Sequence, residues 1–302
     1  MSFKIYGKDG QAALPDFQNN PRLNDPALYI PSDALIDAVN VALSLGQPLL
    51  LTGEPGTGKT QLAYHIAHYF GLGSPLVFTA QTSSTAMDLF YKYDALGHFQ
   101  YNQNNKDPLS IEALEDRFIR YNALGEAIRT QKRAVVLIDE IDKAPRDLPN
   151  DVLFAIEKLS FRVPELKNKE FKTDKKMRPI IILTSNSEKN LPDAFLRRVV
   201  YFHIPSPTGE ELLDILKDKT DGFSEDELAY IVDHFAKTDK LPMKKKPATA
   251  ELIYWALLLK EIEFPITKLG SKLGTDDKKK LDKSYSVLAK NKEDLDLLKN
   301  KL

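Results

Sequence analysis

The sequence predicts an α/β fold, in which a parallel sheet is covered by helices on both faces and is followed by a smaller helical domain. Short apolar segments alternate with stretches of helical periodicity over the first two thirds of the chain, which is typical of βαβ units. Several segments are apolar without interruption, as in strands buried on both faces. Beyond Pro205 and Pro207 only helical periodicity remains. The predicted strands are residues 48–52, 76–79, 134–139, 180–184 and 199–204.

The composition limits the class of protein. The chain has 302 residues, of which 42% are hydrophobic, so it can bury a full core. Its formal net charge of −1 predicts no general attraction to nucleic acid or anionic membranes. It contains no cysteine, which excludes disulfides and thiolate metal sites. No apolar run approaches the roughly 18 residues of a membrane-spanning helix. The first residues do not resemble a signal peptide, so we expect a cytoplasmic protein.

We expect three parts along the chain. Residues 1–31 contain four prolines and are predicted to be an irregular leader. Ser32 is a good helix N-cap followed by apolar residues at helical spacing, so the α/β domain is predicted to span residues 32–207. Residues 208–302 are predicted to be helical, with a modestly basic surface tail from residue 268. The expected helices lie near residues 208–219, 224–237, 247–263 and 288–301.

Two segments depart from simple strand–helix alternation. Residues 84–110 carry aromatic side chains among Gly and Asn without clean periodicity, and we interpret them as an insert that forms a small hairpin or loop. A helix is predicted from Ile111 to Gln131. Residues 161–178 contain two β-like pieces around a charged turn, which predicts a hairpin. This segment suits either a solvated turn or contact with a substrate, since residues 162–178 include seven basic and three acidic side chains.

The segment after the first predicted strand has the composition of a phosphate-binding loop. Its glycines allow backbone N–H groups to approach phosphate oxygens, and the start of the following helix adds partial positive charge. Lys59 is expected to reach the β- and γ-phosphates, and the Thr60 hydroxyl is expected to bind Mg²⁺. We therefore predict that the phosphates of a nucleotide are bound by Gly53, Glu54, Pro55, Gly56, Thr57, Gly58, Lys59, Thr60 and Gln61.

Polar residues follow three later strands. Asp139 ends one buried strand and is predicted to hold Mg²⁺, while the adjacent Glu140 is predicted to polarise the attacking water. Asn186 follows the next strand and is a candidate for holding that water or the γ-phosphate. Arg197 and Arg198 precede the last strand and could stabilise charge on a transferring phosphoryl group, within the same chain or from a neighbour. The alternatives are a solvated acidic turn, a turn-forming asparagine and a surface ion-pair cluster.

These motifs, in this order, resemble the AAA+ ATPases and most closely their MoxR-like branch. In that comparison residues 53–60 match the Walker A motif, residues 135–140 match Walker B, and Asn186 matches sensor 1. Arg197 and Arg198 match the arginine-finger position. Residues 83–91 resemble the helix-2 insert of this branch, and residues 161–178 fall where a pre-sensor-1 hairpin is expected. The likeness extends from about residue 30 to residue 260, and it implies a P-loop NTPase αβα sandwich with a small helical lid domain.

The resemblance also implies a function. It implies an enzyme that binds and hydrolyses Mg-ATP in a homo-oligomeric ring, expected to be a hexamer, and that remodels or activates a partner protein, possible partners including von Willebrand A domain proteins. The chain departs from the family at Lys246–Leu252, where a sensor 2 arginine is often found and none is present. Two other functions stay open: a nucleotide-gated binding module with little turnover, and a DNA-acting motor, against which the balanced charge argues.

Overall fold

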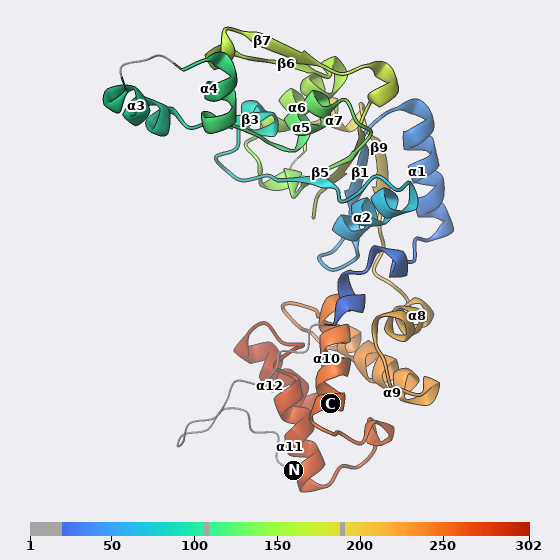
Figure 1. Ribbon diagram of the computed structural model, residues 1–302. Coiled ribbons are helices and arrows are strands. Elements are labelled where there is room, and N and C mark those ends of the chain that lie inside the picture. Colours follow the sequence, from blue (N-terminus) through green and yellow to red (C-terminus); the bar gives the residue numbers. More distant parts are fainter. Residues whose placement is uncertain (1–19, 106–108, 188–190) are drawn as a thin grey trace. The chain divides into compact units, whose positions relative to one another are not determined.

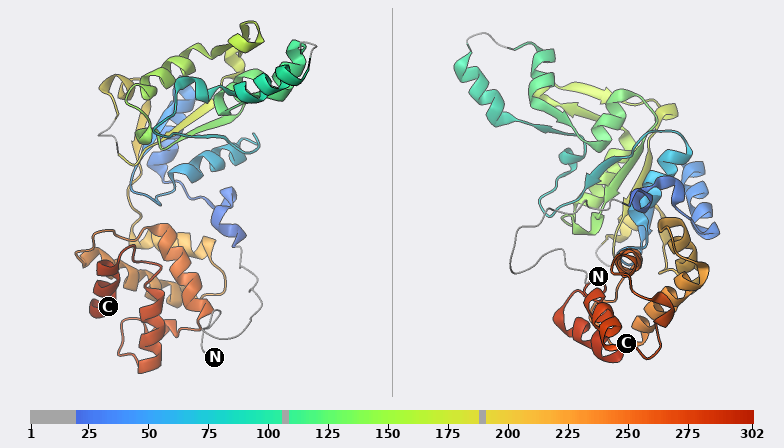
Figure 2. Two further views of the ribbon diagram at one scale, coloured as in Figure 1. Left: turned by 90° about the vertical axis from the view of Figure 1, so that its left-hand side faces the viewer. Right: turned by 60° about the horizontal axis from the view of Figure 1, so that its bottom comes forward.

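The computed structural model describes residues 20–105, 109–187 and 191–302, and it divides the chain into two compact units. The N-terminal unit comprises residues 31–54 and 58–204. The C-terminal unit comprises residues 20–30 and 205–302, and the short stretch Pro55–Thr57 is grouped with it. Figures 1 and 2 show the sheet in the first unit and only helices and loops in the second. Most of the predicted leader, residues 1–19, lies outside the described residues.

The N-terminal unit is built on one parallel five-stranded sheet in the order β2-β5-β8-β1-β9. All five strands occur where the apolar segments predicted them, which confirms the α/β fold. The register places Leu49 opposite both Ile182 and Val200, and Val135 opposite Ile180, so the strands end at common edges. The strands are β1 (Leu49–Thr52), β2 (Leu76–Thr79), β5 (Val135–Asp139), β8 (Ile180–Thr184) and β9 (Val200–His203).

Helices cover both faces of this sheet. Alternate strand residues such as Leu50, Val136 and Leu183 share a core with α5 (Ala123–Thr130), α6 (Leu148–Lys158) and α7 (Asp193–Leu196). The intervening strand residues are equally buried, because side chains alternate between the faces of a strand. On that second face the sheet contacts α1 (Asp33–Leu45) and α2 (Lys59–Tyr69). The α1 helix begins as expected, since the Ser32 hydroxyl accepts a hydrogen bond from the Leu35 amide.

The predicted helix from Ile111 to Gln131 is wrong, because a strand divides it. The segment forms α4 (Ile111–Phe118), β4 (Ile119–Tyr121) and α5. Strand β4 pairs antiparallel with β3 (Tyr91–Tyr93) of the insert, and α3 (Ala95–Asn104) lies between them in the sequence. The pairing is reinforced at its end, where the Asn122 amide donates to the Asp88 carbonyl at 2.6 Å. A long-range strand pair therefore overrides the local helical pattern.

Two aromatic residues of the insert, Phe90 and Tyr91, pack against a hairpin. Strands β6 (Ser160–Val163) and β7 (Lys169–Lys172) pair antiparallel within the segment for which the sequence predicts a hairpin. Phe161 stacks on Phe90 at 4.8 Å and on Phe171 at 5.1 Å between ring centroids, and the Tyr91 hydroxyl donates to Glu165. These contacts give Phe90 and Tyr91 of the insert a common core with the hairpin, whereas Tyr101 packs on Phe118 and Phe99 is exposed.

The C-terminal unit is helical, and its core includes the segment that was predicted to be a surface tail. Its helices are α8 (Gly209–Lys219), α9 (Glu225–Ala236), α10 (Thr249–Glu261), α11 (Thr275–Ser284) and α12 (Lys292–Lys301). The expectation of a surface tail after residue 268 is wrong, since Leu281, Tyr285 and Leu298 are buried in the core around Trp255. Across the described residues, no helix has both the length and the apolar character needed to cross a membrane.

Residues 20–30 belong to this helical unit. The ammonium group of Lys219 donates hydrogen bonds to the carbonyls of Arg22, Leu23 and Asp25, and the Asn20 amide donates to the Lys219 carbonyl at 2.7 Å. The part of the predicted irregular leader that the structure describes includes two short 3-10 helices, Pro21–Asn24 and Pro26–Leu28. These partly buried hydrogen bonds fix the segment to α8.

Candidate nucleotide-binding site

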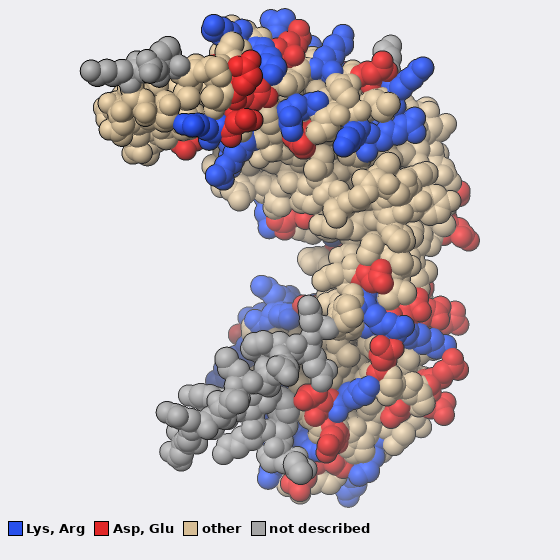
Figure 3. Space-filling view, viewed as in Figure 1, with Lys and Arg blue, Asp and Glu red and all other residues tan. Residues whose placement is uncertain are grey.

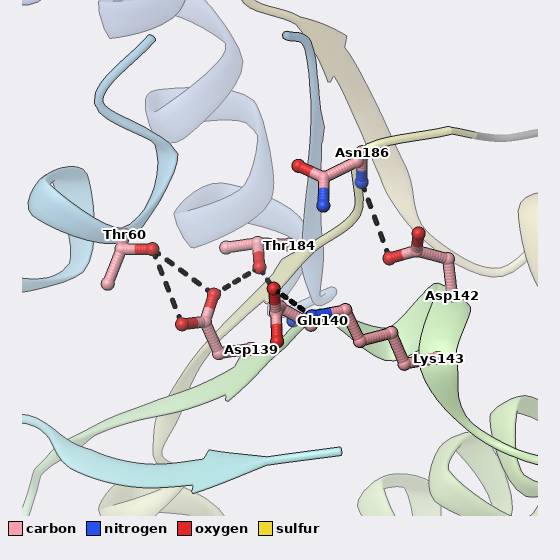
Figure 4. Close-up of polar contacts among 7 residues, drawn as sticks. All are labelled: Thr60, Asp139, Glu140, Asp142, Lys143, Thr184 and Asn186. Carbon is pink, nitrogen blue, oxygen red and sulfur yellow. Dashed lines mark hydrogen bonds and ion pairs between the residues drawn. The ribbon is translucent and has the colours of Figure 1, made fainter. Parts of the chain in front are cut away.

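The carboxyl ends of β1, β5 and β8 meet at one edge of the sheet. Since these strands are parallel neighbours, the residues that follow them are brought together, although they lie far apart in the sequence. This edge is where open α/β sheets bind ligands. It gathers the glycine-rich loop after β1, Asp139 and Glu140 at the end of β5, and the polar tip of β8. Figure 4 shows seven residues of this cluster.

The loop between β1 and α2 has the backbone shape of a phosphate cradle. Gly53, Gly56 and Gly58 have φ angles of 144°, 82° and 87°, in the region that residues with a Cβ rarely adopt. Helix α2 begins at Lys59, so the free N–H groups of its first turn follow directly after the glycines. Backbone donors and a helix N-terminus in this arrangement bind anions.

The side chain of Lys59 is buried within the loop. Its Nζ donates to the carbonyl oxygens of Gly53 at 2.7 Å and Glu54 at 2.9 Å, and the residue is only 8% exposed. Loss of hydration lowers the pKa of this ammonium group, while the nearby carboxylates of Asp139 and others act in the opposite direction. Among the described residues this cation donates hydrogen bonds to carbonyl oxygens alone, and it can exchange these partners for the oxygens of a polyphosphate.

Thr60 and Asp139 provide oxygen ligands suited to Mg²⁺. The Thr60 hydroxyl donates to the two carboxylate oxygens of Asp139 at 3.1 and 3.4 Å, so a hydroxyl and a carboxylate already converge beside the loop. Mg²⁺ prefers such hard oxygen ligands and keeps several sites for water and phosphate oxygens. The donor set therefore fits this ion together with a nucleotide.

Thr184 is a site residue that the sequence analysis missed. Its hydroxyl donates to Asp139 Oδ1 and accepts a hydrogen bond from the Glu140 amide at 2.9 Å, so one side chain fixes both acidic residues (Figure 4). Thr184 is 1% exposed. Its position as the last, polar residue of an otherwise apolar strand is the signal that could have identified it.

Glu140 is held in a defined position at the edge of the site. Its backbone has φ 57° and ψ 44°, a left-handed conformation that is unfavourable for a residue with a long side chain. Its carboxylate oxygen Oε1 lies 2.6 Å from Nζ of Lys143, one turn further along the chain. Lys143 was also not singled out from the sequence, because a single lysine after an acidic pair looks like a solvated charge.

Asn186 lies near this cluster but does not bond through its side chain to the acidic pair. It is exposed, and its backbone N–H donates to Asp142 Oδ1 at 3.3 Å. In Figure 4 no interaction joins its amide group to Asp139 or Glu140. The structure therefore places Asn186 just beyond the carboxyl end of β8, two residues after Thr184, and no hydrogen bond drawn in Figure 4 joins its side-chain amide to the acidic pair.

Arg197 and Arg198 are not part of this cluster. They precede β9, whose first residue Val200 pairs with Leu49 at the beginning of β1. They consequently lie at the amino edge of the sheet, opposite the phosphate loop, and strands of four or five residues separate the two edges by about 15 Å. Both residues are exposed, and neither makes an ion pair with a carboxylate in the described part of the chain.

The sequence of this chain matches a known family. Residues 48–199, half of the chain, match the AAA domain (dynein-related subfamily). Two solved structures of RuvB variants from Thermotoga maritima are similar at 16% sequence identity, with TM-scores of 0.47 and 0.46. In each case the similarity covers 84% of this chain and 67% of the RuvB chain. Because the matched residues make up half of the chain, the chain belongs to the AAA family, with a domain of the dynein-related subfamily.

Proposed function

We propose that this protein binds Mg-ATP at the carboxyl edge of the sheet and hydrolyses it. The observation that carries the proposal is the convergence of a glycine-rich anion cradle, a buried lysine, and a hydroxyl–carboxylate pair at one strand edge. Membership of the AAA family supports the same activity, since these domains generally bind ATP. The triphosphate would lie along residues 53–61, with Lys59 moving from the Gly53 and Glu54 carbonyls to the β- and γ-phosphate oxygens.

Each side chain then has a separate role in the proposed reaction. Bound Mg²⁺ would neutralise charge on the phosphates, and Thr60 and Asp139 would hold it. Glu140 would orient and polarise the attacking water, which requires it to leave Lys143. Thr184 positions Asp139 and Glu140 through its two hydrogen bonds. Asn186, with its amide free of the acidic pair, could then contact the water or the γ-phosphate.

Arg197 and Arg198 would act on the nucleotide of a neighbouring copy. Their place at the amino edge of the sheet, about 15 Å from the phosphate loop, is too distant for them to reach the nucleotide of their own chain. The complete site would therefore form only in an oligomer, and the MoxR-like resemblance suggests a hexameric ring. The same resemblance suggests a role in remodelling or activating a partner protein, for example one with a von Willebrand A domain.

A nucleotide-gated assembly module with little turnover is the second candidate. The Lys246–Leu252 segment lacks a sensor 2 arginine, and the Lys143 ammonium holds Glu140. Both features favour nucleotide binding over rapid hydrolysis. A DNA-acting motor has less support because the net charge is balanced. Strong, salt-sensitive binding to duplex DNA would be needed to support a DNA-acting motor.

The decisive experiment compares the wild type with Glu140→Gln. We expect the variant to bind Mg-ATP normally and to hydrolyse it about 100-fold more slowly, because a general base typically contributes 10²- to 10⁴-fold. Glu157→Gln, an exposed residue on α6, is the matched control and should be fully active. Full turnover in Glu140→Gln would remove Glu140 as the base. Negligible turnover in the wild type, with nucleotide-dependent assembly, would favour the second candidate.

A second measurement addresses the arginines. Specific activity should rise with protein concentration, and Arg197→Ala combined with Arg198→Ala should abolish that rise. Turnover that does not change on dilution and is unaffected by this pair of substitutions would refute a site shared between copies.

A further inference from the structure

The chain passes from the central sheet to helix α8 over a very short stretch. Ile204 still donates a backbone hydrogen bond to the Thr52 carbonyl of β1 at 2.8 Å. Residues 205–207 alone then separate it from Thr208, the N-cap of α8, and two of these three residues are prolines. Proline fixes the φ angle, so this connection is stiff as well as short. It ties the amino end of α8 to the N-terminal unit.

The carboxyl end of α8 has a second connection, made by residues 20–30, which we call the strap. The strap belongs to the C-terminal unit, and the N-terminal unit begins at the residue that follows it. Lys219 binds the carbonyl of Asp25 within the strap. Six residues then separate Asp25 from Ser32, the N-cap of α1. The strap therefore leads from the last turn of α8 to the start of α1.

Lys219, the last residue of α8, fastens the strap through main-chain atoms. Its partly buried Nζ donates to the carbonyl oxygens of Arg22 at 2.9 Å, Asp25 at 3.2 Å and Leu23 at 3.3 Å. An ammonium group has three N–H donors, so these acceptors match its full capacity. The Asn20 side-chain amide donates in return to the Lys219 carbonyl at 2.7 Å. Hydrogen bonds from a charged donor are stronger than neutral ones, which makes this a firm attachment.

General attraction between charges does not explain how the strap is held. Figure 3 shows acidic side chains gathered over the surface where Figure 1 places α8 and α9. The strap, however, carries one basic and one acidic residue, Arg22 and Asp25. Arg22 forms an ion pair with Asp221, but both side chains are exposed, and such pairs contribute little. Leu23 packs against the core of the C-terminal unit. We therefore attribute the attachment mainly to the directed bonds of Lys219.

We propose that the strap is a second tether, which restricts how the helical unit moves relative to the N-terminal unit. A unit joined by one short segment can rotate about it in any direction that avoids a clash, and such motion is the usual behaviour of linked domains. A second attachment at the other end of the same helix excludes rotations that would carry this end away from α1. Hinge motion that preserves both connections remains. This restriction holds whether or not the protein hydrolyses ATP.

Two changes loosen the second tether in different ways. Lys219→Met removes the ammonium group but keeps an aliphatic side chain, so the strap should detach from α8. An insertion of six Gly and Ser residues between Ile30 and Pro31 keeps every contact of the strap and lengthens only the path to α1. The first change therefore tests the fastening, and the second tests the tether itself.

Each change has a matched control in the C-terminal unit. Lys280→Met removes another ammonium group that binds a main-chain carbonyl, that of Glu263 at 3.0 Å, away from the strap. The same six-residue insertion between Ser271 and Lys272, which are both exposed, lengthens a loop that does not connect the two units.

The readouts are inter-unit distance and strap attachment. The chain has no cysteine, so introduced cysteines take fluorescent dyes selectively. Asn40→Cys on α1 and Asp296→Cys on α12 place one dye on an exposed position of each unit. Single-molecule energy transfer without nucleotide then gives the distribution of the distance between the units. Hydrogen exchange of the Leu23, Asp25 and Leu28 amides, which are bonded within the strap, reports its attachment.

We expect Lys219→Met to speed exchange of the strap amides about tenfold, because they lose protection when the strap detaches. The same variant should broaden the distance distribution about twofold, since a single linker allows wider motion. The insertion after Ile30 should broaden the distribution similarly and leave strap exchange unchanged. Both controls should behave like the parent. Unaltered Trp255 fluorescence would show that the C-terminal core stays folded.

Three outcomes would overturn the proposal. Unchanged strap exchange in Lys219→Met would show that Lys219 does not fasten the strap. Fast exchange together with an unchanged distance distribution would make the strap a part of the helical core with no effect on motion. An unchanged distribution after the insertion would exclude a second tether even if Lys219→Met failed to fold, because the insertion removes no contact.

Discussion

Mild acid should destabilise the C-terminal unit through one buried histidine. His234 is 1% exposed and lies against Trp255 and Tyr285, at 5.5 and 6.0 Å between ring centroids. Its Nε2 hydrogen-bonds the Tyr285 hydroxyl at 2.8 Å, and its Nδ1 has no partner among the described residues. Burial, and then the positive charges of Lys237 and Lys278, lower the pKa of His234 from 6.5 to about 4.

The sign and size of the effect follow from this shift. Below about pH 6.5 the unfolded chain binds a proton that the folded unit excludes until about pH 4, so folding stability falls as the pH falls through this window. Between about pH 7.5 and about pH 5 the loss attributable to His234 is about 2 kcal/mol, and it reaches about 3 kcal/mol below pH 4. This is a large share of the free energy of unfolding of a typical domain.

Urea unfolding at these two pH values measures the effect. The chain contains a single tryptophan, Trp255, so its fluorescence reports the unfolding of this unit alone. We expect His234→Gln, which keeps a polar group for Tyr285 but cannot bind a proton, to lose about 2 kcal/mol less than the wild type on acidification. All other titrating groups are present in both proteins. An equal loss of unfolding free energy in the two would therefore show that His234 does not cause it.

Two further substitutions test the site and the core. Thr184→Val should lower the turnover number about tenfold and the free energy of unfolding by about 1–2 kcal/mol, since Asp139 loses a donor and the Glu140 amide loses its acceptor. Thr184→Ser, which keeps the hydroxyl, should turn over ATP like the wild type. Full activity of Thr184→Val would contradict the positioning role. Gly125→Ala should cost about 3 kcal/mol in thermal or urea unfolding, because a Cβ there would lie 1.9 Å from the Phe90 carbonyl oxygen. Gly274→Ala, which meets nothing within 4 Å, is its control, and equal stability of the two variants would exclude the clash.

The elements that the sequence predicted well are those specified locally. The five strands are continuous apolar runs between turn residues, and helix α1 has both its serine N-cap and a left-handed Gly46 at its end. The phosphate loop is equally local, since its glycines, lysine and threonine are consecutive. Asp139 and Glu140 could be placed because they end an apolar run, and parallel strands bring such ends to one edge.

The elements that the sequence did not predict depend on distant partners. Strand β4 continues a helical pattern and becomes a strand only because β3 pairs with it. Helix α11 is mostly charged, and it contributes little to the core besides Leu281 and Ser284. The role of Thr184 arises from the register of β8 against β5, which places Leu183 opposite Ile138. Without this register, a threonine at the end of a strand indicates only a preference for β structure.

The polarity of the parallel sheet bears on how copies of the chain could assemble. The nucleotide-binding groups follow the strands, whereas Arg197 and Arg198 precede one, so the two halves of the proposed site lie on opposite edges of the same sheet. If the amino edge of one copy contacts the nucleotide edge of the next, a two-fold symmetric pair cannot complete both nucleotide sites at once. Such a head-to-tail contact leaves an unfilled edge at each end of any open chain. Only closure into a ring would give every bound nucleotide its arginines, and turnover per site should then depend on how many copies the ring has gathered.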